Sequence, residues 1–268
     1  MINYKVQNHS LSGAVKDFGQ LLAERPPFLF LDRDGTLVPI ADNPKEAILS
    51  SSTSNVLRQL SSRLSKRIAI VSARSLNMLA AECDPREFIL AGNYGLEMSF
   101  PSGQVCIHPE VQKVHSLLSE VRVELAQLAD YDTRLFVDDH QYSLCLHFHK
   151  VSTAERHIIH GQMHELEQKY PSLVFRALPT SYEIVPSIKW NKASALQAIV
   201  GKLSLSADDF LCMAFGDSLA DEPMFQWVNR HHGLSFRVGE CESTEANSLL
   251  NAPSDVIDFL ESLLLLPL

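Results

Sequence analysis

The sequence lacks an excess of basic residues. Its 23 lysines and arginines are outnumbered by 32 aspartates and glutamates, so the 268 residues carry a net charge of −9. A protein that binds the phosphate backbone of nucleic acid needs a basic face that displaces counterions. The acidic balance therefore argues against nucleic acid as a partner.

Long apolar runs are also missing. None reaches the roughly 18 residues that a membrane-spanning helix needs. The first ten residues, MINYKVQNHS, lack the charged-then-apolar pattern of a signal peptide. We therefore expect no membrane partner, and the short apolar tail at 259–268 predicts a terminal helix that docks on the core.

Cysteine is scarce, and no internal repeat or low-complexity tract is present. The five cysteines are odd in number and lie far apart in the chain, without the paired spacing of a zinc site. Reduced thiols fit this pattern better than a disulfide framework does, and they predict a cytoplasmic location.

What the sequence does contain is enough apolar material for a packed core. Apolar residues make up 46% of the chain and charged residues 21%, as in ordinary globular proteins. Since single domains commonly run to about 100–200 residues, we expect two domains.

Short apolar runs separated by helical stretches predict the main fold. The clearest run, Phe28–Leu31, follows two prolines and ends in Asp32, which suits a strand buried on both faces. Similar runs occur at 68–71, 88–91, 210–215 and 232–238, with helical apolar spacing between the first two at 56–64. The pattern predicts an α/β fold with a doubly wound, Rossmann-like parallel sheet that binds ligands at the carboxyl ends of its strands.

The middle of the chain has a different pattern. An amphipathic helix over 114–128 is followed by Tyr142–His149, which alternates as a half-exposed strand does. A second helix over about 153–170 and strands at 173–178 and 181–185 complete an α+β pattern. We therefore expect an inserted domain at 106–183 and a discontinuous core at 1–105 and 184–268.

Two carboxylates stand at the end of the first predicted strand. Asp32 and Asp34 are two residues apart, and Gly35 allows a tight turn, so both side chains can face one point. The pair suits a hard cation beside a nucleophilic carboxylate. A plain turn or a calcium-type loop is the alternative, but the buried strand and the absence of EF-hand spacing argue against it.

Three later positions fit the same site. Ser72 ends the second strand and could instead cap a helix. Lys192 opens a helical stretch and could instead be an ordinary solvated lysine, with Lys189 as a nearby competitor for its role. Asp217 and Asp221 follow the strand at 210–215, where Asp217 could be a helix cap. The four positions together, in this order, favour one common site.

These residues resemble the motifs of the haloacid dehalogenase superfamily of phosphatases, and within it the trehalose-6-phosphate phosphatases. The long insertion between Ser72 and Lys192 resembles the superfamily's C2-type cap. The resemblance covers roughly Pro27 to the end of the chain. The segments that carry the closer likeness are Ile70–Arg74, Leu90–Glu97, Glu183–Pro186 ahead of Asn191-Lys192, and Gly216 through Asp221-Glu222 to Phe225.

The resemblance implies a magnesium-dependent hydrolase of trehalose 6-phosphate, whose partner is a small sugar phosphate. The sequence does not report the oligomeric state, and a monomer is one possibility. Asp32 would become the aspartyl phosphate, and Asp34 would serve as acid and base. Mg²⁺ would be bound by Asp32, the backbone carbonyl of Asp34 and Asp217.

The remaining site residues are likewise implied by the resemblance. Ser72 and Lys192 would hold the phosphoryl oxygens, and Asp221 would orient Lys192 or metal-bound water as part of the metal site. The implied contacts to the sugar phosphate are made by Arg74, Asn93, Glu183, His147 and His149.

Departures from the family pattern put the identity of the sugar in doubt. Arg33 replaces a usual aromatic residue and Tyr94 a usual histidine, while Asp138, His140 and His149 are substitutions in the predicted cap. Glucosylglycerol phosphate and mannosylglycerate phosphate are therefore rival substrates, and a catalytically silent regulatory domain is a rival function. Alternative interpretations of two sets of residues also stay open. Glu183 could be an exposed strand-end carboxylate, and Cys145, His147 and His149 could bind a metal.

Overall fold

The computed structural model describes residues 22, 24–41, 44 and 46–266, so the expectation for the first ten residues and the end of the apolar tail lie outside the described part. Within that part the chain forms two compact units. The first takes in the chain as far as Ser72, Leu76–Cys106 and the chain from Trp190 onward, and the second takes in Ala73–Ser75 and Ile107–Lys189. None of the described helices is both long and apolar enough to cross a membrane.

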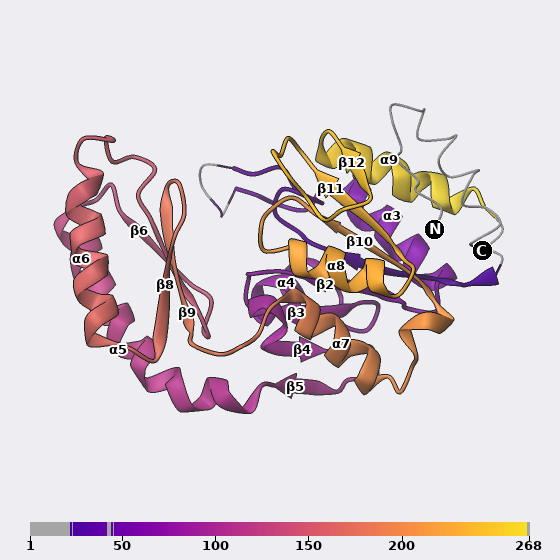
Figure 1. The fold of residues 1–268 in the computed structure, drawn as a ribbon, viewed down its shortest axis with the longest axis horizontal. Coiled ribbons are helices and arrows are strands. Elements are labelled where there is room, and N and C mark those ends of the chain that lie inside the picture. Colours follow the sequence, from indigo (N-terminus) through magenta and orange to yellow (C-terminus); the bar gives the residue numbers. More distant parts are fainter. Residues whose placement is uncertain (1–21, 23, 42–43, 45, 267–268) are drawn as a thin grey trace. The chain divides into compact units, whose positions relative to one another are not determined.

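An eight-stranded sheet organises the described residues of the first unit (Figure 1). Its strands are β1 (Pro27–Leu31), β2 (Ile68–Val71), β3 (Ile89–Gly92), β4 (Glu97–Ser99), β5 (Val105–Ile107), β10 (Leu211–Gly216), β11 (Leu234–Val238) and β12 (Ser248–Leu250). They lie in the order β12-β11-β10-β1-β2-β3-β4-β5. Pairing is parallel from β12 to β3, and β4 joins β3 antiparallel. The predicted doubly wound sheet is therefore confirmed.

Helices cover both faces of this sheet because its central strands are apolar on both faces. In β1, Leu29 and Leu31 pack into the core beneath α3 (Ser51–Arg63), α4 (Leu76–Glu82) and α9 (Pro253–Leu264). Phe28 and Phe30 point the other way, into the core beneath α7 (Lys192–Lys202) and α8 (Glu222–Arg230). Two 3₁₀ turns, η1 (Asn93–Gly95) and η2 (Ala207–Asp209), lie in the loops.

The second unit is a four-stranded antiparallel sheet with two helices. The strands β6 (Phe136–Asp139), β7 (Leu144–His147), β8 (Leu173–Ala177) and β9 (Ser181–Pro186) lie in the order β6-β7-β9-β8. The helices α5 (Pro109–Tyr131) and α6 (Arg156–Lys169) pack on one face through a shared apolar cluster (Figure 1). The predicted helix-plus-antiparallel pattern is therefore present.

Two expectations for this unit differ from the structure. Residues 184–189 group with the second unit rather than with the core, because β9 continues as far as Pro186. Strand β7 is also not half-exposed, since Cys145 on its second face is buried. The register pairs Cys145 with Asp138 on β6 and with Glu183 on β9, so neighbouring side chains flank the thiol.

Candidate active site

The sheet order brings three of the predicted positions to one edge. Strand β1 pairs with β10 on one side and with β2 on the other. Asp32, Ser72 and Asp217 each follow the last residue of one of these strands. Because the carboxyl ends of parallel strands lie at the same edge, these residues converge although they are far apart in the chain.

Lys192 joins two of the carboxylates. Its Nζ donates to Oδ1 of Asp32 at 2.6 Å and to Oδ1 of Asp221 at 2.5 Å. The lysine side chain is 2% exposed, so it is not the solvated lysine of the alternative interpretation. Lys189, its competitor in the sequence, is exposed. The contacts therefore favour Lys192 for the position beside Asp32.

Asp221 is fully buried and organises the loop that precedes α8. Its Oδ2 accepts hydrogen bonds from the backbone N–H of Ser218 at 3.0 Å, from the Ser218 hydroxyl at 2.8 Å and from the Asp217 N–H at 3.2 Å. Its other oxygen accepts from Lys192. Since both oxygens are already engaged by protein donors, these contacts suit the orienting role better than direct metal ligation. Asp217 is not the cap of α8, whose N-cap is Asp221.

One ammonium faces more negative charge than it can balance. Burial raises the pKa of Asp32 well above its usual range, against the attraction of Lys192, and the charges of Asp221 and Asp217 raise it further. Burial and the charge of Asp221 likewise raise the pKa of Asp217 to about 6. Burial alone would lower the pKa of Lys192, but the charges of Asp221 and Asp32 outweigh it and raise that pKa. The surplus of negative charge favours a further cation.

The donor set fits a divalent ion that prefers oxygen. Carboxylate oxygens of Asp32, Asp217 and Asp221 all lie within 4.8 Å of one another. Hard cations such as Mg²⁺ bind carboxylate and carbonyl oxygens at about 2.0–2.1 Å, so two ligands of one ion lie at most about 4.2 Å apart. The spacing of these oxygens is close to that limit. Among the described residues no other group of His, Cys, Asp and Glu is gathered in this way, so the Cys145, His147 and His149 alternative finds no support.

Two glycines allow these carboxylates to approach the backbone. A Cβ on Gly35 would lie 2.1 Å from Oδ2 of Asp217, and Gly35 has a φ of +82°. A Cβ on Gly216 would lie 2.3 Å from Cγ of Asp221. Side chains cannot fit at such distances, so the close packing of these loops around the carboxylates requires glycine at both positions.

Ser72 and Asn93 lie on neighbouring strand ends of the same unit. The Ser72 N–H donates to the Ala91 carbonyl at 3.0 Å, which places the buried serine beside β3. Helix α4 begins only at Leu76, whose N–H donates to Oε1 of Glu97. The Asn93 side chain donates to the same oxygen at 2.7 Å, so Glu97 contacts both the start of α4 and Asn93.

The ion pair between Arg33 and Glu82 is a further functional candidate, and the sequence did not predict it. Arg33 donates to Oδ1 of Asp34 at 2.6 Å and to the carboxylate of Glu82 at 2.7–2.9 Å. The available signal was a charged residue between two aspartates at a position where the family has an aromatic one. Its partner, 49 residues away, left no sign in the sequence.

The other predicted sugar-phosphate contacts belong to the second unit. Arg74 and Glu183 are buried, and His147 and His149 are partly exposed. Glu183 lies within β9 and accepts a bond from Arg176 at 3.3 Å, so it is not the exposed strand-end carboxylate of the alternative. Burial lowers the pKa of His147, opposed by the nearby charge of Asp138. His140 is paired with Asp138 at 3.2 Å.

Comparison with known proteins agrees with this geometry. A model of the trehalose-phosphatase family matches residues 30–256. Probable trehalose-phosphate phosphatase I of Arabidopsis thaliana is 26% identical over 88% of this chain and 66% of its own length. Trehalose 6-phosphate phosphatase RA3 of Zea mays is 27% identical over 93% of this chain and 74% of its own length.

Solved structures show the same fold. The C-terminal domain of the C. albicans trehalose-6-phosphate phosphatase is 22% identical, with a TM-score of 0.76 over 90% of this chain and 93% of that domain. The fold is shared with a haloacid dehalogenase-like hydrolase from Bacteroides thetaiotaomicron, which is 16% identical with a TM-score of 0.61 over 88% of this chain and 99% of that chain, so the fold class is haloacid-dehalogenase-like. Within that class, the match over residues 30–256 shows that the chain belongs to the trehalose-phosphatase family.

Proposed function

We propose that the chain hydrolyses trehalose 6-phosphate to trehalose and phosphate through a phosphorylated Asp32. The observation that carries the proposal is the buried cluster in which Lys192 bonds Asp32 and Asp221 while Asp217 lies close by. Membership of the family supports a phosphatase, and the names of the curated relatives support this sugar phosphate.

The reaction divides into two transfers. An oxygen of Asp32 attacks phosphorus in line, and the bond from phosphorus to the sugar oxygen breaks. Asp34 gives its proton to the departing oxygen. Asp34 then takes a proton from water, whose oxygen bonds to phosphorus as the bond to Asp32 breaks. One ester and one water thus become one sugar and one phosphate.

Charge stabilisation is assigned to the surrounding residues. Ser72 and Lys192 hold the phosphoryl oxygens, and Asp221 orients Lys192 through its 2.5 Å bond. Magnesium, held by Asp32, Asp217 and the backbone carbonyl of Asp34, would offset the repulsion between an anionic nucleophile and an anionic substrate.

The second unit is proposed to act as the cap that recognises the sugar. Arg74, Glu183, His147 and His149, together with Asn93 of the first unit, are the proposed contacts to the sugar phosphate. Support comes from the sheet of the second unit. Cys145 and His147 lie on one face of β7, and Glu183 of β9 is the direct cross-strand neighbour of Cys145. This face lies opposite the apolar face covered by α5 and α6.

A substrate panel tests the identity of the sugar. Purified chain with magnesium is given trehalose 6-phosphate, glucosylglycerol phosphate and mannosylglycerate phosphate, and phosphate release is measured. We expect the highest kcat/KM on trehalose 6-phosphate. A preference for another phosphosugar of the panel, or equal turnover of all three, would reject trehalose 6-phosphate as the substrate. The proposed phosphatase mechanism would still stand.

Replacement of the nucleophile separates an enzyme from a silent regulatory domain. We expect Asp32→Asn to abolish magnesium-dependent phosphate release, because an amide cannot form the aspartyl phosphate. Asp209→Asn, at an exposed position in η2, is the matched control and should keep the original rate. An unchanged rate in Asp32→Asn would refute the assigned nucleophile, and no activity in the unmodified chain would favour the regulatory alternative.

We also propose a cytoplasmic location and a monomeric chain. The five cysteines are free thiols, which supports a reducing compartment. Solution mass measurement tests the second statement, and a dimer mass at working concentration would contradict it.

A further inference from the structure

Arg33 has an unusual environment for an arginine. Its side chain is 2% exposed, and arginine is almost never buried to this degree unless it is paired. Nε and Nη2 donate to the Glu82 carboxylate at 2.7–2.9 Å, and Nη2 also donates to the Ala47 carbonyl at 2.5 Å. This is a bidentate contact of the kind that fixes a guanidinium in one orientation.

The third guanidinium nitrogen, Nη1, contacts Asp34, the residue proposed to act as both acid and base. Nη1 donates to Oδ1 of Asp34 at 2.6 Å. The Arg33 backbone carbonyl accepts from the N–H groups of Leu37 at 2.8 Å and Val38 at 3.0 Å, which closes the loop. The residue therefore ties the Asp34 loop together through its backbone and anchors the Asp34 carboxylate through its side chain.

We propose that Arg33, held by Glu82, is a positioning residue for Asp34 and so controls proton transfer to the departing sugar oxygen. The inference rests on the proposed function, in which Asp34 is the acid and base. A guanidinium clamped by Glu82 limits the rotation of the Asp34 carboxylate, and a proton donor acts efficiently only when it is held in hydrogen-bond reach of the leaving group.

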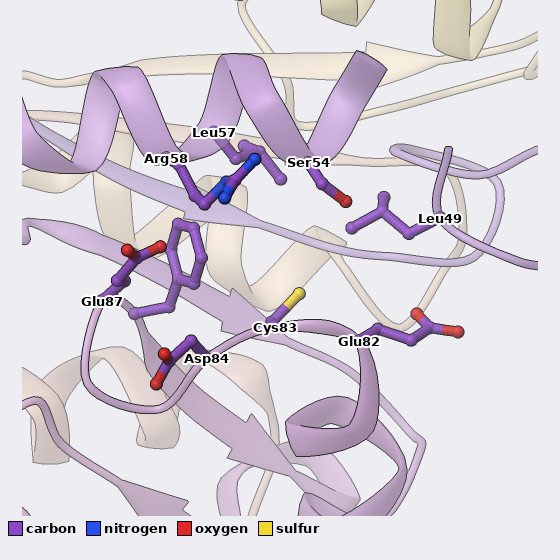
Figure 2. Close-up of a pocket in the computed structure, with 9 residues that line it drawn as sticks. Leu49, Ser54, Leu57, Arg58, Glu82, Cys83, Asp84 and Glu87 are labelled. Atoms are coloured by element: carbon purple, nitrogen blue, oxygen red, sulfur yellow. The ribbon is translucent and has the colours of Figure 1, made fainter. Parts of the chain in front are cut away.

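Glu82 is the partner that orients the Arg33 guanidinium. It is the last residue of α4 and lines a cavity of about 240 Å³ together with Cys83 and Glu87. Figure 2 shows the Glu82 carboxylate at one end of the cavity, directed away from Glu87. The two glutamates therefore share one cavity while only Glu82 contacts Arg33, which makes Glu87 a matched control.

The test compares two leaving groups. A sugar alkoxide leaves poorly without a proton, whereas nitrophenolate leaves readily without one, so only the first needs a well-placed acid. Trehalose 6-phosphate and p-nitrophenyl phosphate are therefore compared in rapid-mixing experiments with magnesium. The first turnover reports transfer to Asp32 without the later hydrolysis step.

Selective loss on the sugar phosphate is the expected result. We expect Arg33→Gln to slow the first turnover of trehalose 6-phosphate by about 10–100-fold, since small misplacements of a reacting group cost about that much. The nitrophenyl phosphate burst should stay close to the original rate. Asp34→Asn gives the reference pattern, with a loss of about 10²–10⁴-fold on the sugar phosphate.

Glu82→Gln and Arg33→Lys test the clamp without removing the bulk of either side chain. Both variants should also lose rate selectively on trehalose 6-phosphate, by a smaller factor than Arg33→Gln. Lysine cannot form the bidentate contact, and the glutamine amide weakens it. Glu87→Gln should leave both rates unchanged. So should Arg63→Gln, which removes an arginine bonded to the Leu264 and Leu266 carbonyls elsewhere in the same unit.

Each outcome decides between the two roles. Equal loss on both substrates in Arg33→Lys and Glu82→Gln would show that the clamp only supports the fold and would overturn the proposal. If Arg33→Gln does not fold, as judged by its thermal transition, Arg33→Lys and Glu82→Gln still distinguish a positioning role from a purely structural one. Absence of activity on both substrates in the unmodified chain would instead refute the proposed function, which is a separate result.

Discussion

At the scale of single residues, Lys192 is the cation that faces two buried carboxylates. It contacts Asp32 and Asp221, and all three side chains are at most 8% exposed. A buried charge that loses its partner is far more costly than an exposed one, because water cannot replace the lost interaction. The stability of the metal-free protein should therefore depend strongly on this ammonium.

Lys192→Met is predicted to lower the free energy of unfolding by about 3–5 kcal/mol, since it leaves two carboxylates buried without a cation. Urea unfolding without magnesium measures the change. Lys202→Met, at the exposed end of the same helix, is the control and should be close to neutral. A loss below about 1 kcal/mol, the range of exposed ion pairs, would show that the pair is solvent-screened.

Gly35 gives a second prediction at this scale. Gly35→Ala places a Cβ 2.1 Å from Oδ2 of Asp217, so the carboxylate or the loop must move. We expect kcat/KM to fall by about 100-fold, as for a misplacement near 1 Å, together with weaker magnesium binding. Gly103→Ala is a matched control, because Gly103 has a similar φ of +85° and no neighbour within 4 Å. Equal losses of activity in both variants would mean that backbone strain, not the contact with Asp217, is responsible.

At the scale of elements, the start of α7 sets where Lys192 lies. Asn191 is the N-cap, and its side chain accepts from the Ser194 N–H at 3.1 Å. Lys192 is the first residue of the helix. A side chain in the first turn keeps its position only as long as that turn does not fray, so the cap supports the active site as well as the helix.

Asn191→Ala should lower the free energy of unfolding by about 0.5–2 kcal/mol through loss of the cap. Phosphatase activity should fall as well, because the first turn holds Lys192. Urea unfolding and kcat measure the two effects. Ser206→Ala is the control, since Ser206 precedes η2 without a side-chain cap bond. A stability loss with unchanged kcat would show that Lys192 is held by its ion pairs alone.

At the scale of the whole molecule, the sheet and the helices α7 and α8 bring two buried carboxylates, the half-buried Asp217 and one lysine together, so metal and protons should compete there. The pKa of Asp217 is about 6, raised by burial and by Asp221. A raised carboxyl pKa disfavours the folded, metal-free state as pH rises from the unfolded value of 3.8 through about 6. Magnesium should remove this penalty, because it binds the charged form.

The thermal stabilisation by magnesium is therefore predicted to be larger at about pH 7.5 than at about pH 5. Below a pH of about 6 the apparent affinity should fall by up to about tenfold per pH unit, as for one competing proton. Thermal melts with and without magnesium, supported by calorimetry, measure both. Asp217→Asn should remove most of the stabilisation and its pH dependence. Equal stabilisation at the two pH values would contradict proton competition at Asp217.

Much of the fold was predictable because strand and helix patterns are local. The apolar runs that became β1, β2 and β10 are continuous and are followed by a polar residue, directly or after Gly216, so their burial and their carboxyl ends could be inferred. Short strands such as β4, β5 and β12, each of three residues, were not predicted. They exist as strands only because a neighbour pairs with them, and their own sequence carries too few residues for a pattern.

The sequence by itself determined the α/β class, the candidate carboxylates at the strand ends and the family likeness, since each depends on residue type and spacing along the chain. Only the tertiary structure decided that Lys192 rather than Lys189 contacts Asp32, that one oxygen of Asp221 accepts from loop donors and the other from Lys192, and that Arg33 is clamped by Glu82. The physical reason is that such contacts join residues up to 160 positions apart. Which side chains make contact depends on how the strands and helices pack, and local sequence patterns do not determine that packing.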